Sequence, residues 1–199
     1  MRVSREQAAE NRERVLAVAG RLFRERGFDA VSIADLMGAA GLTHGGFYKQ
    51  FTSKEALQAE VCARGAADSV AAFDKALSAA RQGETGSSSA FAALLDDYLS
   101  AKHRDQPGNG CTVAALAGDA GRHGERVQEQ LAAGVRGMAE AVHVIRSTAV
   151  RSAGDSTDQL DLATLSAMIG AVVLARSVRE TDPWLSERIL SDTKHRLAQ

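Results

Sequence analysis

The sequence predicts an all-α protein, in which a small N-terminal helical unit precedes a larger C-terminal helical domain. Apolar residues recur at the three- and four-residue spacing of a helix face along most of the chain. No segment alternates apolar and polar residues as a half-buried strand would, and no internal repeat is evident. The composition agrees with this class, because the 199 residues include only two prolines and 5% aromatic residues.

Composition also limits the kind of protein. With 45% hydrophobic and 25% charged residues, the chain is typical of a globular protein of one domain or two small ones. The first residues lack the apolar core of a signal segment, and no stretch reaches the roughly 18 apolar residues of a membrane helix. We therefore expect a cytoplasmic protein with no membrane partner. Cys62 and Cys111 match neither metal-ligand spacing nor a disulfide framework, as expected of reduced thiols.

The first two helices follow from their capping residues and apolar faces. Residues 5–26 form the first helix, and Gly27 follows its last turn, where a left-handed cap is favoured. Ser32 and Asp35 have the spacing of a capping box, which opens a second helix of about two turns. Gly41 ends that helix.

Two further helices complete the N-terminal part. Thr43 is a suitable N-cap for a third short helix, and Ser53 precedes a fourth helix over residues 54–81. This long helix connects two packing units. We therefore place one domain at residues 1–53 and a second, larger domain at residues 54–199.

The C-terminal domain is predicted to be helical throughout. A Gly/Ser loop at residues 82–89 follows the long helix and separates it from the remaining elements. The expected elements are a helix at 91–102, a turn at 107–110, a segment at 111–117, a helix at 125–151, a break at 155–158, and helices at 160–178 and 184–197. Asp182 and Pro183 cap and start the last of these.

Charge is distributed unevenly along the chain. Residues 1–54 hold nine basic and six acidic side chains, which gives +3, whereas the remaining residues hold 15 and 19, which gives −4. A basic end on an acidic body is typical of a protein that binds a polyanion through that end. Ordinary solvated helix faces would give a similar difference.

The second and third short helices have the form of a helix-turn-helix. In this motif, two helices are joined by a tight turn, here at residues 41–42, and the second helix enters a DNA major groove. Placing its residues at 100° intervals puts Phe47 and Phe51 on one buried face. The residues opposite that face are Gly45 and Lys49, and those on its two flanks are Gly46 and Tyr48.

The two adjacent glycines suggest that DNA approaches the backbone closely, because each costs about 1 kcal/mol in a helix interior. Lys49 can then donate to guanine O6 and N7. Groups suited to phosphate are the helix start at Thr43 and His44, the flanking Tyr48, and the residues that open the neighbouring helices, Ser32 and Lys54. The alternative is that the glycines only permit close packing within a small helical subdomain.

The segment SIADLMGAAGLTHGGFYKQFTSKEAL, residues 32–57, resembles the DNA-binding signature of the TetR family of bacterial transcriptional regulators. The match extends over roughly residues 12–60 and includes LFRERGFDAVSI, residues 22–33. It is specific because it fixes many positions at once. The resemblance implies an all-helical homodimer with a three-helix DNA-binding domain at residues 1–53. It also implies a divergent ligand-binding and dimerisation domain at residues 54–199, which binds a small molecule and releases DNA.

The resemblance also implies roles for individual positions. It implies that the residues contacting phosphate are Ser32, Thr43, Tyr48 and Lys54. The resemblance also implies that the residues lying along the DNA bases are Gly45, Gly46 and Lys49. Two positions depart from the usual pattern, since Gln50 stands where His is common and Gly46 lacks a side chain that often touches a base. This leaves Lys49 and His44 as the candidates for base specificity.

The last two helices are the expected dimer interface, because in this family they usually form a four-helix bundle between two chains. The candidate interface residues are Leu165, Met168, Ile169, Val172, Val173, Trp184 and Ile189. The alternative is that they complete the core of one chain. A ligand pocket would lie among Phe91, Leu95, Tyr98, Cys111, Leu116, Val135, Met138 and Val142, although plain core is the commoner role of such residues.

Cys111 suggests a more specific kind of inducer. If a helix starts at Thr112, the thiol sits at a helix N-terminus, where the dipole raises cysteine reactivity. Some TetR-like regulators that sense oxidants or electrophiles carry a Gly-Cys pair here, as this chain does at residues 110–111. A small buried hydrophobe is the commoner role of a lone cysteine. The five histidines show no paired i, i+4 spacing, so we expect neither a metal nor a cofactor.

These observations predict a sequence-specific regulator, a repressor that a small-molecule or electrophile inducer releases from a palindromic operator on double-stranded DNA. An enzyme is the contrasting class, but the chain has no phosphate loop, no His-Glu-x-x-His motif and no serine nucleophile elbow. A second alternative is an architectural DNA-binding protein without ligand control. It would leave about 140 further helical residues without a task.

Overall fold

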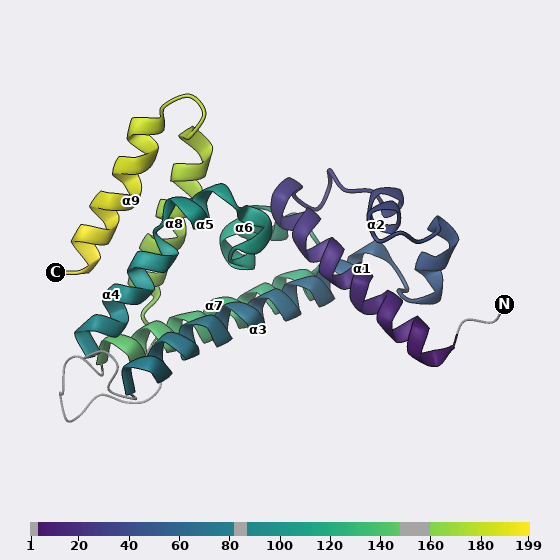
Figure 1. Cartoon of the computed structure of the whole chain (residues 1–199), viewed down its shortest axis with the longest axis horizontal. Coiled ribbons are helices and arrows are strands. Elements are labelled where there is room, and N and C mark those ends of the chain that lie inside the picture. The colour runs from purple at the N-terminus through teal and green to yellow at the C-terminus, as the bar shows by residue number, and fades with distance from the viewer. Residues whose placement is uncertain (1–3, 82–86, 148–159) are drawn as a thin grey trace. The chain divides into compact units, whose positions relative to one another are not determined.

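Every regular element in the described part of the chain is a helix, as predicted (Figure 1). The computed structural model describes residues 4–81, 87–147 and 160–199. Its elements are α1 (Arg5–Arg26), α2 (Ile33–Ala39), η1 (His44–Lys49), α3 (Lys54–Arg81), α4 (Ser87–Tyr98), α5 (Ala101–Asp105), η2 (Pro107–Asn109), α6 (Thr112–Ala120), α7 (Glu125–Ser147), α8 (Leu162–Val178) and α9 (Pro183–Leu197). Among the described helices, none combines the length and apolar character that a bilayer-spanning helix requires.

The helices pack into two compact units whose limits differ from the predicted boundary at residue 53. Unit 1 comprises Met1–Gly65 and Pro107–Ala132, and unit 2 comprises Ala66–Gln106 and Ala133–Gln199. The first turns of α3, together with η2 and α6, therefore belong with the helix-turn-helix. Contacts over a long sequence separation cause this difference, and single-sequence patterns do not reveal such contacts.

Local sequence signals set the N-terminal helices where they were predicted. The Ser4 hydroxyl accepts from the Gln7 amide at the start of α1, and Gly27 ends the helix with a φ of +80°. Ser32 and Asp35 form the predicted capping box at α2, each side chain accepting a hydrogen bond from the other residue's amide. Left-handed backbone at Gly27 favours a residue without a Cβ atom.

Aromatic and aliphatic side chains fill the core of unit 1. Phe23, Phe28, Leu36 and Phe47 are fully buried or nearly so. The Phe28 ring meets Phe23 edge-on, with centroids 5.2 Å apart, and meets His123 in the same way at 4.8 Å. Residues from α1, from the turn before α2 and from the segment after α6 thus share one core.

Helix α6 is held against α1 and α3 by close contacts. The Arg24 guanidinium donates to the Gly108 carbonyl oxygen and to the Thr112 hydroxyl at the start of α6. At its other end, the Asp119 carboxylate accepts from the Phe28 amide at 3.1 Å. Gly65 of α3 faces Thr112 so closely that a Cβ atom there would overlap the threonine side chain.

Unit 2 is built around α8, which packs along α9 (Figure 1). The buried side of α8 carries Leu165, Met168 and Val172, all at most 1% exposed, and Leu190 contributes from α9. The buried residues of α4 and α7 in this unit include Leu94, Leu95, Tyr98, Met138, Val142 and Ile145.

Two predicted boundaries in this unit are different in the structure. Helix 91–102 is instead two helices, because the Ser100 hydroxyl accepts from the His103 amide and caps a new helix, α5. Residues 87–89, predicted as loop, belong to α4. The remainder of that loop and the predicted break at 155–158 lie outside the described residues.

We expect Gly65→Ala to lower the free energy of unfolding by about 1–3 kcal/mol, the usual cost of forcing a methyl group into a packed interior. Gly118→Ala is the matched control, because the added Cβ in α6 would meet no atom within 4 Å. It should be neutral or raise the free energy by up to about 1 kcal/mol. Urea unfolding followed by circular dichroism measures both, and equal losses would contradict the proposed packing.

Candidate DNA-binding interface

The turn between α2 and η1 has the geometry of a helix-turn-helix. Gly41 adopts a φ of +68°, which a side chain would strain, and its amide donates to the Gly38 carbonyl oxygen. The Leu42 amide donates to the Met37 carbonyl oxygen at 2.8 Å, closing the end of α2. The chain therefore reverses within a few residues, and η1 packs directly against α2.

The recognition element η1 is a 3-10 helix rather than the predicted α-helix. Thr43 precedes it but makes no side-chain capping bond. Gly45 and Gly46 are consistent with this geometry, because each glycine lowers the stability of an α-helix by about 1 kcal/mol. A segment of six residues is also short enough to form a 3-10 helix. The predicted buried face is confirmed, since Phe47 is 0% and Phe51 5% exposed and their rings lie 5.5 Å apart.

The two glycines of η1 have different surroundings. A Cβ atom at Gly45 would meet nothing within 4 Å, so this position opens to solvent. A Cβ atom at Gly46 would lie 3.4 Å from Met37 Cε and 3.7 Å from the Thr43 hydroxyl oxygen. A methyl group at Gly46 would thus make ordinary van der Waals contact with α2, and the position of Gly46 along the bases stays a prediction.

An exposed polar surface surrounds Gly45. Tyr48 is 62% exposed, and its ring stands edge-on to Phe47 with centroids 5.2 Å apart. The exposed His44 ring lies 6.4 Å from the Tyr48 ring, and Lys49 is exposed on the last turn. The buried phenylalanine thus fixes the base of a surface whose outer groups can donate hydrogen bonds.

Ser32 and Lys54 are already engaged within unit 1. The Ser32 hydroxyl donates to the Asp35 carboxylate at 2.5 Å and accepts from the Asp35 amide. Donation by the Ser32 hydroxyl, and next by the Ser32 amide, holds the pKa of the Asp35 carboxyl below its usual value. The Lys54 ammonium donates to the Phe28 carbonyl oxygen at 2.7 Å. Lys54 retains further N–H donors for a phosphate, whereas the Ser32 hydroxyl would have to exchange its partner.

Several residues that support this surface could not be found from local sequence signals. Arg24, Asp119 and His123 all hold α1 or the turn that follows it. Arg12 adds a bidentate bond to Glu60, 2.6 Å for each nitrogen–oxygen pair, and its guanidinium lies 4.8 Å from the Phe51 ring centroid. Their partners are distant in sequence, so only the folded structure identifies them.

The residues predicted to line a pocket are divided between the units. Cys111 and Leu116 belong to unit 1, and the other six belong to unit 2. Seven of the eight are at most 9% exposed, and Val135 is half-buried. Within the ranges that the structure describes, no group of three or more His, Cys, Asp or Glu side chains could hold a metal ion.

The predicted interface residues on α8 and α9 fall into two groups. Leu165, Met168 and Val172 line the core of unit 2 and present no surface to a second chain, so we withdraw them as interface contacts. Val173 is 43% and Trp184 70% exposed. The half-buried members are Ile169 and Ile189, and exposed apolar residues that were not predicted are Leu162, Leu174 and Leu185.

Two parts of the chain match known protein families. Residues 15–61 match the family described as bacterial regulatory proteins, tetR family. Residues 89–183 match the family described as tetracyclin repressor-like, C-terminal domain.

Curated relatives match over the helix-turn-helix region. The chain is 40% identical over 53 residues to the uncharacterized HTH-type transcriptional regulator YerO of Bacillus subtilis (strain 168), and 37% identical over 60 residues to the HTH-type transcriptional regulator AcrR of Shigella flexneri. These matches cover 27% and 30% of this chain but only 18% and 28% of the relatives.

A solved structure matches over nearly the whole chain. It is a TetR transcriptional regulator from Chloroflexus aurantiacus, with a TM-score of 0.74 and 27% identity, covering 97% of this chain and 94% of that one.

Proposed function

Because this chain belongs to the TetR family of DNA-binding transcriptional regulators, we propose that it is a homodimeric repressor of a palindromic operator. A small-molecule or electrophile inducer releases it. The observation that carries the proposal is the surface of η1, where an open glycine, an exposed tyrosine and an exposed lysine sit over a buried phenylalanine. This function places the protein in the cytoplasm with the DNA that it controls.

The contacts in this proposal divide into two kinds. Gly45 lets the backbone of η1 approach the base edges, and Lys49 donates to guanine O6 and N7, with His44 as a second base reader. Phosphate contacts come from Thr43, Tyr48 and Lys54, which fix the register of the protein on the duplex. Ser32 contributes mainly by capping α2, because its hydroxyl is occupied by Asp35.

The dimer forms through the exposed apolar residues of α8 and α9. A palindromic operator requires two recognition elements related by a two-fold axis, so the contact surface must be self-complementary. The proposed interface consists of Leu162, Ile169, Val173, Leu174, Trp184, Leu185 and Ile189. A small-molecule inducer would bind in unit 2 among the apolar residues of α4 and α7, whereas an electrophile would react with Cys111 in unit 1.

The first test is fluorescence anisotropy of the full chain against duplex tiles from the DNA flanking its own gene, with random duplex as competitor. We expect one tile to bind at least about 10³-fold more tightly than random DNA, with a steep dependence on salt. Similar affinity for all tiles and for random DNA would favour the architectural alternative. Binding to no tile would exclude an operator beside the protein's own gene. Selection from a random duplex library would then show whether the protein binds any specific sequence.

Gly45→Ala should weaken binding to the selected tile about tenfold, which corresponds to roughly 1.4 kcal/mol. The added Cβ points into open space in the free protein, so the free energy of unfolding should not fall. Gly46→Ala is the matched control, because its Cβ points toward Met37 of α2. Equal affinity for Gly45→Ala and the unaltered protein would show that the η1 backbone does not approach DNA.

An electrophile inducer is favoured by one observation, that Cys111 is the N-cap residue of α6. We expect maleimide to label Cys111 faster than Cys62 in the folded chain. Cys62 is 0% exposed and burial raises its pKa to about 11, whereas Cys111 is 8% exposed. Mass spectrometry of the labelled peptides measures both rates. Labelling of Cys62 at an equal or higher rate would remove the support for thiol sensing.

A further inference from the structure

The recognition element η1 has few local interactions of its own to hold it. No side chain caps its start, since the Thr43 hydroxyl makes no capping bond, and two of its six residues are glycines, which lower the stability of a helix. Just after its last residue, the side-chain oxygen of Gln50 is buried and has no hydrogen-bond partner within the described residues. Contacts from other parts of unit 1 must therefore hold this element in place.

A row of three aromatic rings connects the exposed side of η1 to its buried end. The Tyr48 ring stands edge-on to Phe47, with centroids 5.2 Å apart, and the Phe47 ring lies 5.5 Å from the Phe51 ring. The backbone amides of Gln50 and Phe51 both donate to the Phe47 carbonyl oxygen, at 2.9 and 3.0 Å. How the last turn of η1 closes therefore depends on where Phe51 lies.

An arginine of α1 contacts the Phe51 end of this row. The Arg12 guanidinium carbon is 4.8 Å from the centroid of the Phe51 ring, which is within the range of a cation–π contact. Two nitrogens of the same guanidinium donate to the two carboxylate oxygens of Glu60 on α3, each at 2.6 Å. This bidentate pair sets the plane of the guanidinium, so α1 and α3 together fix the group that contacts Phe51.

We propose that Arg12 is a positioning residue of the recognition surface, which holds η1 and the exposed Tyr48 in place through the Phe51 ring. A surface whose donors are ordered before binding loses less conformational entropy when it meets DNA. Arg12 would thus raise the affinity for the operator without itself contacting the duplex. The effect on DNA rests on the function proposed above, whereas the anchoring of η1 does not.

A lysine at position 12 separates the geometry of the guanidinium from its charge. Lysine keeps the positive charge and can still pair with Glu60, but it lacks the planar fork that stacks on a ring. In the free protein, Arg12→Lys should speed hydrogen exchange about tenfold at the backbone amides of Gln50 and Phe51. Exchange of the full chain followed by NMR at single amides measures this without DNA. Unchanged exchange at these two amides would overturn the proposal.

The two kinds of duplex give a second measurement. Arg12→Lys should weaken binding to the operator duplex, found among the tiles or by selection, about tenfold, and should leave the affinity for random duplex unchanged, because the charge is kept. The salt dependence of operator binding should keep its slope in Arg12→Ala, whereas loss of a direct phosphate contact lowers the slope by about one per subunit. Equal weakening on both duplexes would indicate a merely structural role and would overturn the proposal.

Two glutamine variants form a matched pair. Glu60→Gln removes the carboxylate that orients the Arg12 guanidinium. Glu13→Gln removes the carboxylate that accepts from Arg64, so each variant loses one ion pair between α1 and α3. We expect Glu60→Gln to speed exchange severalfold at the two amides and Glu13→Gln to leave it unchanged. Equal effects would mean that joining the two helices matters rather than the contact with Phe51, which would refute the positioning role.

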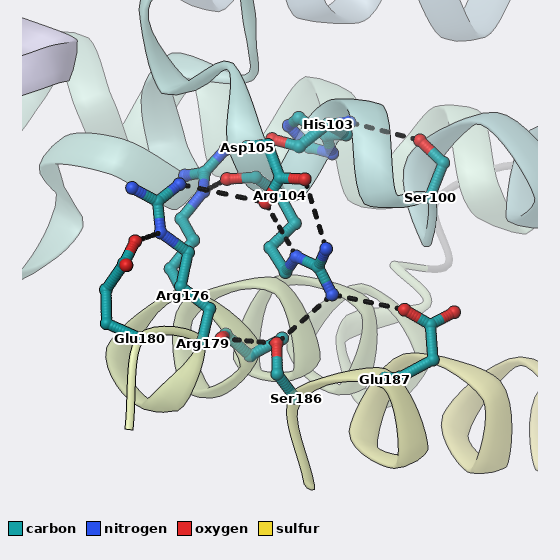
Figure 2. Close-up of polar contacts among 10 residues, drawn as sticks. Ser100, His103, Arg104, Asp105, Arg176, Arg179, Glu180, Ser186 and Glu187 are labelled. Atoms are coloured by element: carbon teal, nitrogen blue, oxygen red, sulfur yellow. Dashed lines mark hydrogen bonds and ion pairs between the residues drawn. The ribbon is translucent and has the colours of Figure 1, made fainter. Parts of the chain in front are cut away.

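An arginine of unit 2 controls for the loss of a bidentate pair as such. Arg104 binds the Asp105 carboxylate at 2.8 and 3.0 Å and also donates to Ser186 and Glu187 (Figure 2). Arg104→Lys loses the same kind of fork in the unit that does not carry η1. It should change neither the exchange at the two amides nor the ratio of operator to random affinity. Changes as large as those of Arg12→Lys would indicate general destabilisation and contradict the proposal.

The outcomes separate this proposal from the DNA-binding function. Faster exchange at the two amides in Arg12→Lys, with neither control changed, would establish the anchoring of η1 even if no duplex bound specifically. Specific binding that Arg12→Lys does not weaken would overturn the positioning role, although the DNA-binding function would then be confirmed. If Arg12→Lys does not fold, Glu60→Gln decides between these outcomes, because it leaves the arginine in the chain.

Discussion

The helix-turn-helix depends on the way in which Phe28 is held. Its ring packs edge-on against Phe23 and His123, its amide donates to Asp119, and its carbonyl accepts from Lys54. The residue is fully buried, so each of these backbone groups would carry a desolvation cost without its partner. Four separate parts of unit 1 therefore meet at one residue in the turn between α1 and α2.

This arrangement explains why α6 belongs to the N-terminal unit. A three-helix motif of about 50 residues buries a smaller fraction of its surface than a larger domain does, so further packing stabilises it. Helix α6 and the preceding η2 supply that packing, through Gly108 and Thr112 on Arg24 and through Asp119 on Phe28.

Local and periodic features could be predicted from the sequence because their causes are local. The capping box of Ser32 and Asp35, the limits of α1 and the buried face of Phe47 and Phe51 each depend on residues a few positions apart. The different surroundings of Gly45 and Gly46 could not be predicted in this way. They depend on where Met37 of α2 lies relative to η1.

Features that depend on distant residues could not be predicted from the sequence, for two physical reasons. Contacts between residues 24 and 108 or between residues 28 and 119 join segments 84 to 91 positions apart, and no periodic pattern records them. In α8, almost every position is apolar or small, so the sequence does not distinguish the side that faces the core from the side that faces outward. Leu165 and Val173 look alike in sequence, yet one is 1% and the other 43% exposed.

The polar groups near η1 differ in how much of their bonding capacity the fold already uses. Ser32 and Lys54 are held by Asp35 and by a backbone carbonyl, whereas Tyr48 and Lys49 extend from the surface. Exposed charges more than about 10 Å apart are largely screened at physiological salt, so the overall charge of −1 says little about DNA binding. What matters is the few donors carried on a rigid base, because a donor fixed before binding loses less conformational entropy when it meets a phosphate or a base.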